Sequence, residues 1–235
     1  MTKNASVPPA RQEPRLSVNK IGEYMTANPL RRQRILRDAK YPPAFQVKRY
    51  EEACEAIVGY FTGRRDMSAI TRKIEEVSAR RGGTTFEVES NLNTLEALEQ
   101  FYDNADGIRL PENFRALSGL SGNLPPLTFN GTDISIRPEA IIQHELKGKP
   151  VVGSIKLYLS KTHPLSQESA DYIGALVCHQ MREIYTKDTE VNPKCCYVYD
   201  VFRSIQYLAP KSYTLKLNNV KAACTEISDR WGNII

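Results

Sequence analysis

The sequence has no long hydrophobic run, and its cysteines are few and form no recognisable pairs. No apolar stretch approaches the roughly 18 to 20 residues that a transmembrane helix needs, and the first twenty residues are polar and contain prolines, unlike a secretory leader. The cysteines are odd in number and include no C-x-x-C pair: Cys54, Cys178, Cys195, Cys196 and Cys224. A disulfide framework and a standard zinc module are therefore not expected. We expect a globular protein of a reducing cytoplasm that does not contact the membrane.

Positive charge is concentrated in the N-terminal third. The 235 residues carry 32 Lys and Arg against 27 Asp and Glu. Residues 1–81 hold 17 of the basic and 9 of the acidic residues, so the rest of the chain is mildly acidic. This asymmetry suggests an electrostatic contact surface, for which phosphate backbones are the commonest partner. The alternative is an ordinary solvated helical face.

The first part of the chain is predicted to be helical. Residues 1–15 contain three prolines and read as a disordered lead-in, and residues 16–88 as a basic helical region. Ser17 can cap one helix, and Asn28 followed by Pro29 can begin a second. Apolar residues recur at helical spacing over 50–61 and 66–81, and Gly82-Gly83 ends the region. The second helix carries four candidate nucleic-acid-binding residues, on more than one of its faces: Arg31, Arg32, Arg34 and Arg37.

The second part, residues 89–235, mixes helices and strands. Asn93 and Glu96 have the spacing of a capping box in front of a helix. Turn signals at Asn130-Gly131 and Lys147-Gly148-Lys149 separate strands over 127–129, 133–143 and 151–160. A helix over 166–185 follows, capped by Ser166, then strands over 196–202 and 205–208 and a last helix over 217–231. The fold class is therefore α/β, with a helical N-terminal region and an αβββαβ core around a mixed sheet.

One group of residues in this core has the composition of a chemical site. Arg137-Pro138-Glu139 lies on the second strand and Ser154-Ile155-Lys156 on the third. Because side chains alternate along a strand, Ser154 and Lys156 share a face, and a hairpin partner can bring Glu139 beside them. A carboxylate that holds Mg²⁺ and a lysine that orients the attacked phosphate are what metal-assisted phosphodiester hydrolysis requires.

With these residues the sequence resembles the PD-(D/E)XK nuclease superfamily, and within it the RecB-like branch that includes the CRISPR-adaptation exonucleases. Pro138-Glu139 corresponds to the Pro-Asp of the family and Lys156 to its motif lysine, and Gln180 lies where many RecB-like members carry a glutamine. The segment LSVNKIGEYMTANPLRRQRIL is similar to the N-terminal pattern of the family. The resemblance implies a restriction-endonuclease-like core, Mg²⁺ or Mn²⁺ as cofactor, DNA as partner, and a role such as phage defence or DNA processing.

The sequence also departs from the family pattern. The second acid of the motif, two residues before the lysine, is Ser154, a poor ligand for a hard dication. Ala27-Asn28 stands where some relatives have an iron–sulfur cysteine, so no cluster is implied. The helix over 50–61 has no histidine, and Glu55 is its nearest substitute as a metal ligand. Glu96 or Glu99 is a candidate for the missing acid.

Each candidate residue has a structural explanation as well. Glu139 would then be a hairpin-edge carboxylate, Lys156 an edge lysine reaching solvent, Glu96 only a capping residue and Gln180 a solvent-facing helix residue. The histidines share no metal-ligand spacing and are expected at the surface: His144, His163 and His179. Cys195-Cys196 is most simply the start of a strand.

Three functions follow from these observations. The first is a Mg²⁺-dependent DNA nuclease with Glu139, Lys156 and Ser154 at the catalytic centre and Glu139 and Glu96 on the metal. The second is a catalytically inactive module of the same fold that binds DNA or a protein, which the neutral Ser154 favours. The third is an interaction subunit whose arginines contact an acidic protein.

Overall fold

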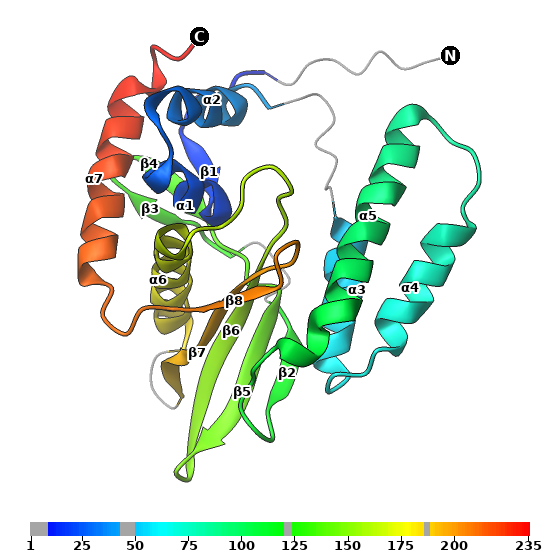
Figure 1. Cartoon of the computed structure of the whole chain (residues 1–235). Helices are drawn as coiled ribbons and strands as arrows, with labels where there is room; N and C mark the ends of the chain where they lie inside the picture. Colours follow the sequence, from blue (N-terminus) through cyan, green and yellow to red (C-terminus); the bar gives the residue numbers. More distant parts are fainter. Residues whose placement is uncertain (1–8, 43–49, 120–123, 186–188) are drawn as a thin grey trace.

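A computed structural model describes residues 9–42, 50–119, 124–185 and 189–235, and it is an α/β protein built on two sheets (Figure 1). The larger sheet has the strand order β2-β5-β6-β7-β8. Its strands are β2 (Arg115–Ser118), β5 (Ala140–Leu146), β6 (Lys149–Tyr158), β7 (Glu190–Asp200) and β8 (Ile205–Leu208). Only β6 and β7 pair in parallel; the other neighbours are antiparallel. The sheet is therefore mixed, as expected.

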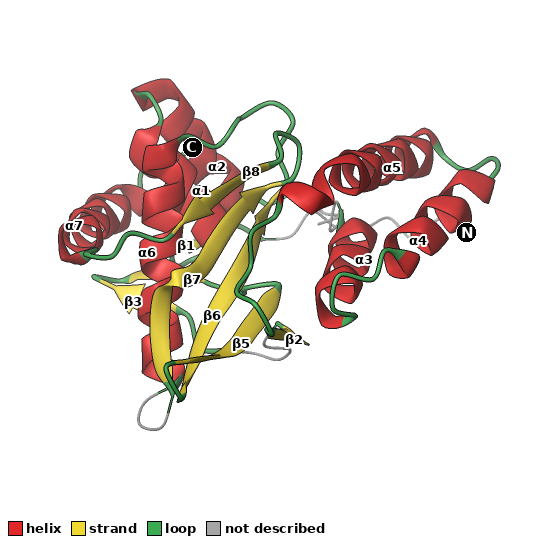
Figure 2. Cartoon of the chain, turned by 60° about the horizontal axis from the view of Figure 1, so that its bottom comes forward, coloured by secondary structure: helices red, strands yellow, loops and turns green. Residues whose placement is uncertain are grey.

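Helices cover both faces of the larger sheet (Figure 2). One face packs against α6 (Gln167–Ile184), on which α1 (Val18–Thr26) and α7 (Thr214–Trp231) pack in turn, and Ile141 and Val152 point into this core. The other face packs against α3 (Glu51–Thr62) and α5 (Thr85–Asn104) through Ile142, Ile155 and Leu157. The alternation along the buried parts of β5 and β6 thus assigns their side chains to two layers. No described helix is long and apolar enough to cross a membrane.

Three of the helix starts are those predicted from the sequence. The Ser17 hydroxyl accepts the Lys20 N–H at the start of α1. The Asn28 side chain accepts the Arg31 N–H at 2.9 Å at the start of α2 (Pro29–Lys40), whose first residue is Pro29. A short polar side chain at this position satisfies an amide that the helix leaves unpaired. Ser166 caps α6 in the same way through the Ser169 N–H, also as predicted.

The N-terminal helical region is divided between the two sides of the sheet. Helices α1 and α2 lie on the α6 side, whereas α3, α4 (Ser68–Ala79) and α5 form a three-helix arm on the other side (Figure 1). The boundary predicted at residue 88 falls within α5. The capping box of α5 is formed by Thr84 and Glu87, and the one predicted at Asn93 and Glu96 is wrong because both residues lie inside this helix.

Three further expectations about strands are corrected. The strand predicted over 133–143 is two strands, β4 (Thr132–Ser135) and β5, which belong to different sheets. Pro138 lies at the break, where a residue without an N–H cannot continue a ladder. The lead-in predicted over 1–15 overlaps β1 (Arg15–Ser17) at its last residue, Arg15, and β1 pairs in parallel with β4; residues 1–8 lie outside the described residues. The edge strand β2 was not predicted; β3 (Leu127–Phe129) was.

Gly22 allows α1 to approach α6 closely. A Cβ atom at this position would lie 2.5 Å from Ile173 Cγ1 and 3.0 Å from the Ser169 carbonyl oxygen. Alanine usually stabilises a helix interior relative to glycine, but here the steric conflict with the neighbouring helix is larger. The α1–α6 contact therefore requires the smallest residue at position 22.

We predict that Gly22→Ala lowers the free energy of unfolding by about 1–3 kcal/mol, because α1 must move away from α6. Urea denaturation monitored by circular dichroism measures this change. Gly107→Ala is the matched control, since a Cβ there has nothing within 4 Å, and it should change stability by no more than about 0.5 kcal/mol. Equal effects of the two substitutions would contradict this role of Gly22.

Candidate functional site

The interruption between β4 and β5 at Pro138 places Glu139 immediately before β5, opposite the middle of β6. The Glu139 N–H donates to the Ile155 carbonyl at 2.9 Å, and Ala140 and Ile155 are partners in the ladder. Ser154 and Lys156 have the same parity as Val152, which faces the α1 and α6 layer, and Glu139, just before β5, reaches Lys156 from the neighbouring strand. The hairpin therefore brings the acid and the amine of the sequence motif together.

Glu139 and Lys156 form a largely buried ion pair. Lys156 Nζ lies 2.5 Å from Glu139 Oε1 and donates to the Arg137 carbonyl at 3.0 Å. The second carboxylate oxygen, Oε2, accepts the Leu157 N–H at 2.6 Å. The Lys156 side chain is only 9 % exposed and that of Glu139 20 %. Because an unpaired charge in this position would be costly, each residue depends on the other, and Lys156 is not an edge lysine that reaches solvent.

Ser154 lies on the same face but is completely buried. It pairs with Cys196 of β7 in the ladder, and its hydroxyl oxygen has no hydrogen-bond partner among the described residues. The cysteine neighbours Cys195 and Cys196 are likewise buried, and all five cysteines are free thiols. Ser154 is therefore enclosed between the sheet and its neighbours rather than open to a solvated ligand.

A cavity of ≈ 340 Å³ opens beside Glu139 and is lined with carboxylates from α3. Glu51 and Glu55 come from the first two turns of this helix. Arg137 and Pro138 come from the segment that connects β4 and β5, and Gly119 follows β2. The Gly119 N–H donates to the Glu139 carbonyl at 2.7 Å, and a Cβ at Gly119 would lie 1.9 Å from the Pro138 oxygen. This close approach fixes the edge of β2 against the break, so that Glu139 and the two glutamates of α3 share one cavity.

Cys54 also lines this cavity but is not an activated nucleophile. Burial, followed by the nearby negative charge of Glu139, raises the pKa of its thiol to about 12, against a smaller opposing effect of Lys156. The thiol is therefore protonated at neutral pH, and thiolates rather than thiols are the nucleophilic species.

The donor atoms around the cavity suit a hard, oxygen-seeking cation better than a soft one. Among the described residues, no three His, Cys, Asp or Glu side chains are already gathered closely enough to enclose a metal ion. Mg²⁺ does not need such a cage, because it commonly binds one or two carboxylates and completes its shell with water and phosphate oxygens. Glu139 with Glu55 or Glu51 matches that requirement.

The other predicted site residues lie elsewhere. Glu96, predicted as a metal ligand, does not line the cavity and forms an ion pair with Lys161, which also donates to Asn93. Glu99 is exposed on α5. Gln180 is buried, not solvent-facing as the alternative reading had it, and donates to the Pro125 carbonyl at 3.2 Å.

The four arginines of α2 have different environments. Arg31 Nε donates to Glu23 at 2.6 Å, and Arg32 donates to the Tyr24 and Met25 carbonyls. These two side chains are half-buried and hold α2 against α1, whereas Arg34 and Arg37 are exposed. The helical pattern could not separate the two groups, because the partners of Arg31 and Arg32 come from the preceding helix.

The three histidines are partly exposed, and they lie far apart in the sequence. His144 Nε2 lies 3.1 Å from Cys195 Sγ across β5 and β7. Burial raises the pKa of the Cys195 thiol to about 11, so this pair is not an activated dyad either.

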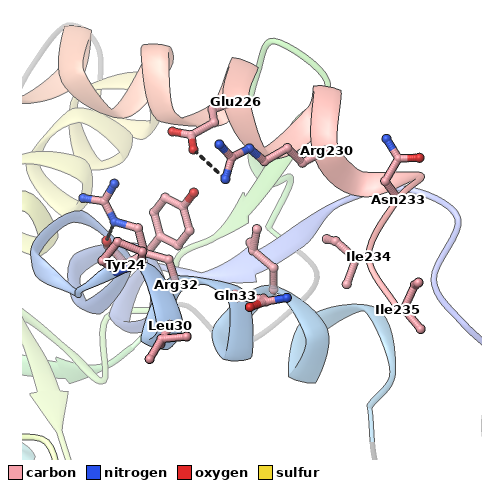
Figure 3. A pocket seen from close by; sticks show the side chains of 11 residues that line it. Tyr24, Leu30, Arg32, Gln33, Glu226, Arg230, Asn233, Ile234 and Ile235 are labelled. Atoms are coloured by element: carbon pink, nitrogen blue, oxygen red, sulfur yellow. Dashed lines mark hydrogen bonds and ion pairs between the residues drawn. The ribbon is translucent and has the colours of Figure 1, made fainter.

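A second cavity of ≈ 540 Å³ lies between α2 and the end of α7 (Figure 3). The Tyr24 ring forms part of its wall, under the Arg32 guanidinium, and Glu226 and Arg230 form an ion pair at its rim. It shares no lining residue with the Glu139 cavity. The phosphodiester chemistry predicted from the sequence therefore has no counterpart there.

Comparison with family models and with curated proteins finds no match for the chain.

We predict that Glu139 and Lys156 are energetically coupled. Glu139→Gln and Lys156→Met should each destabilise the fold, and the double variant should cost about 1–3 kcal/mol less than the sum of the two. Urea unfolding of the four proteins gives this coupling energy. The more exposed pair Glu96 and Lys161, changed in the same way, should give less than about 1 kcal/mol. Equal coupling in both pairs would contradict a special role of the buried one.

Proposed function

We propose that this protein is a metal-dependent nuclease that hydrolyses nucleic-acid phosphodiesters, most readily DNA, at the cavity beside Glu139. The observation that carries the proposal is the meeting of Glu139 with Lys156 at the break before β5. An acid and a lysine on adjacent strands are the shared elements of the PD-(D/E)XK pattern, to which the sequence is similar.

The order of elements supports the same proposal. Helix α5 is followed by the antiparallel strands β2, β5 and β6, then by α6, and then by β7, which is parallel to β6. This is the αβββαβ order of restriction-endonuclease-like cores, with β3 and β4 inserted and β8 added at the edge. We assign β5 and β6 to the two motif-bearing strands.

The residues around the cavity have complementary roles in this proposal. Lys156 contacts a non-bridging phosphate oxygen and offsets the negative charge that develops during attack. The Glu139 carboxylate and one glutamate of α3, Glu55 or Glu51, would hold Mg²⁺ or Mn²⁺, and the exposed Arg137 side chain binds a neighbouring phosphate. When bound, the metal would polarise the phosphate and acidify a water molecule. In this scheme α3 supplies the second acid in place of Ser154.

A second function is favoured by a specific observation. Ser154 is sealed from solvent, and both oxygens of Glu139 already accept hydrogen bonds from within the chain. A site that stayed in this arrangement would retain the fold and the phosphate-binding groups but could not release Glu139 to a metal. The protein would then be a nuclease-like module that binds DNA or a partner protein without cutting.

A hydrolysis assay separates the two functions. Linear duplex, single-stranded DNA and RNA are incubated with the protein and Mg²⁺ or Mn²⁺, with EDTA as the metal-free reference. We expect metal-dependent degradation, and Lys156→Ala and Glu139→Ala should each lower its rate by about 100-fold or more, as loss of one charge-stabilising group typically does.

Glu55→Gln tests the proposed second ligand and should raise the metal concentration needed for half-maximal activity. Glu96→Gln is its control, because Glu96 lies outside the cavity, and it should leave this concentration unchanged. Degradation that is equal in wild type and both alanine variants would disprove the nuclease proposal. A wild type that binds DNA but never cuts it would favour the binding module.

A further inference from the structure

A second polar groove adjoins the Glu139 cavity and shares one residue with it. This groove has a volume of ≈ 880 Å³ and lies between β1, the start of α1, α2 and β4. Arg137 lines both the groove and the Glu139 cavity. The Arg137 carbonyl accepts a hydrogen bond from Lys156 Nζ at 3.0 Å, so the residue shared by the groove and the cavity is in direct contact with the proposed catalytic pair.

The groove has several features that attract anions. Its basic residues are Arg11, Arg15, Lys20 and Arg137, and Ser17 marks the N-terminus of α1 within it. Unpaired amides at a helix N-terminus add partial positive charge. Lys20 is engaged with Glu23, and Arg11 donates to the Arg15 carbonyl, whereas the Arg15 and Arg137 side chains are exposed.

Acidic residues in the groove limit what it can bind. Glu13, Asp38 and Asp133 also line it, and Asp133 accepts the Thr128 hydroxyl at 2.7 Å. The cations outnumber these acids by only one. Such a surface is suited to a few phosphates at fixed places and not to a long, uniformly charged backbone.

The size and composition of the groove indicate which form of nucleic acid fits. Its volume is that of a small-ligand site, which suits part of one strand rather than a double helix. None of the described residues that line it is aromatic, so it has no platform on which bases would stack. Recognition would depend on phosphates and would be insensitive to base sequence.

We propose that this groove guides a single nucleic-acid strand to the Glu139 cavity, with Arg15 and Arg137 as its phosphate contacts. The inference rests on the proposed function, because it identifies the path of the substrate to that site. It also replaces the surface predicted from the sequence: the strand contacts the groove beside β1 and β4 and not the exposed arginines of α2.

Binding of fluorescein-labelled oligothymidylate, measured by anisotropy in EDTA over a series of salt concentrations, tests this inference. Each phosphate contact on a single strand contributes about −0.7 to the log–log salt slope. Arg15→Ala/Arg137→Ala should therefore make the slope less negative by about 1.4 and weaken binding by at least roughly tenfold, the equivalent of about 1.4 kcal/mol. Arg34→Ala/Arg37→Ala removes the same net charge and should leave the slope unchanged.

The outcomes distinguish the groove from the proposed function. If the Arg34/Arg37 variant changes the slope and the Arg15/Arg137 variant does not, the strand lies on α2 and the groove inference is overturned, whereas hydrolysis by wild type would still support a nuclease. Tighter binding of a matched duplex, or a strong preference for oligothymidylate over oligoadenylate, also overturns it. If the wild-type protein shows no salt-dependent binding, the groove inference is rejected, and the proposed function is then tested by the hydrolysis assay alone. Circular dichroism of both double variants confirms that they are folded.

Discussion

The ion pair between Glu139 and Lys156 is the interaction on which the candidate site depends. A lysine ammonium on an inner strand is tolerated only with a partner that compensates for lost hydration, and Glu139 provides it at 2.5 Å. Glu139 can reach Lys156 because the strand is interrupted at Pro138 and β5 begins directly after Glu139. The Arg137 carbonyl and the Leu157 amide complete the hydrogen bonds of the pair. The same irregularity places Arg137 in the lining of the neighbouring groove, so it positions two charged side chains, those of Arg137 and Glu139.

The two layers on either side of the sheet contribute different parts of the site. The α1 and α6 layer receives the side chains of the motif strands, and its packing requires the small Gly22. The three-helix arm contributes the carboxylates of Glu51 and Glu55, which reach the cavity because α3 lies against the edge strand β2. Lys161 holds the arm to the core through Asn93 and Glu96, and Gln100 bonds Ser204 at 3.0 Å. The distance between the Glu139 carboxylate and those of Glu51 and Glu55 therefore depends on how firmly the three-helix arm is attached to the core.

Local signals in the sequence predicted local structure well. The caps at Ser17, Asn28 and Ser166 and the turn at Lys147-Gly148 need only a few neighbouring residues, and these were correct. The strand break at Pro138 carried a local signal too, since proline cannot serve in a central ladder, but the apolar alternation on both sides concealed it. The shared cavity of Glu55 and Glu139 and the internal partners of Arg31 and Arg32 could not be predicted, because they arise from contacts between separate elements. The distribution of charge indicated a basic surface but could not show which arginines form hydrogen bonds within the protein.

A crystal structure of the full chain with Mn²⁺ would test the central claim most directly, because the anomalous signal of the ion locates it without reference to activity. The account predicts a Mn²⁺ peak in the Glu139 cavity, coordinated by Glu139 and by a glutamate of α3, with the Lys156 ammonium displaced from Glu139 Oε1. A cavity without the ion, in which the Glu139–Lys156 pair is unchanged while Mn²⁺ binds elsewhere or not at all, would contradict it.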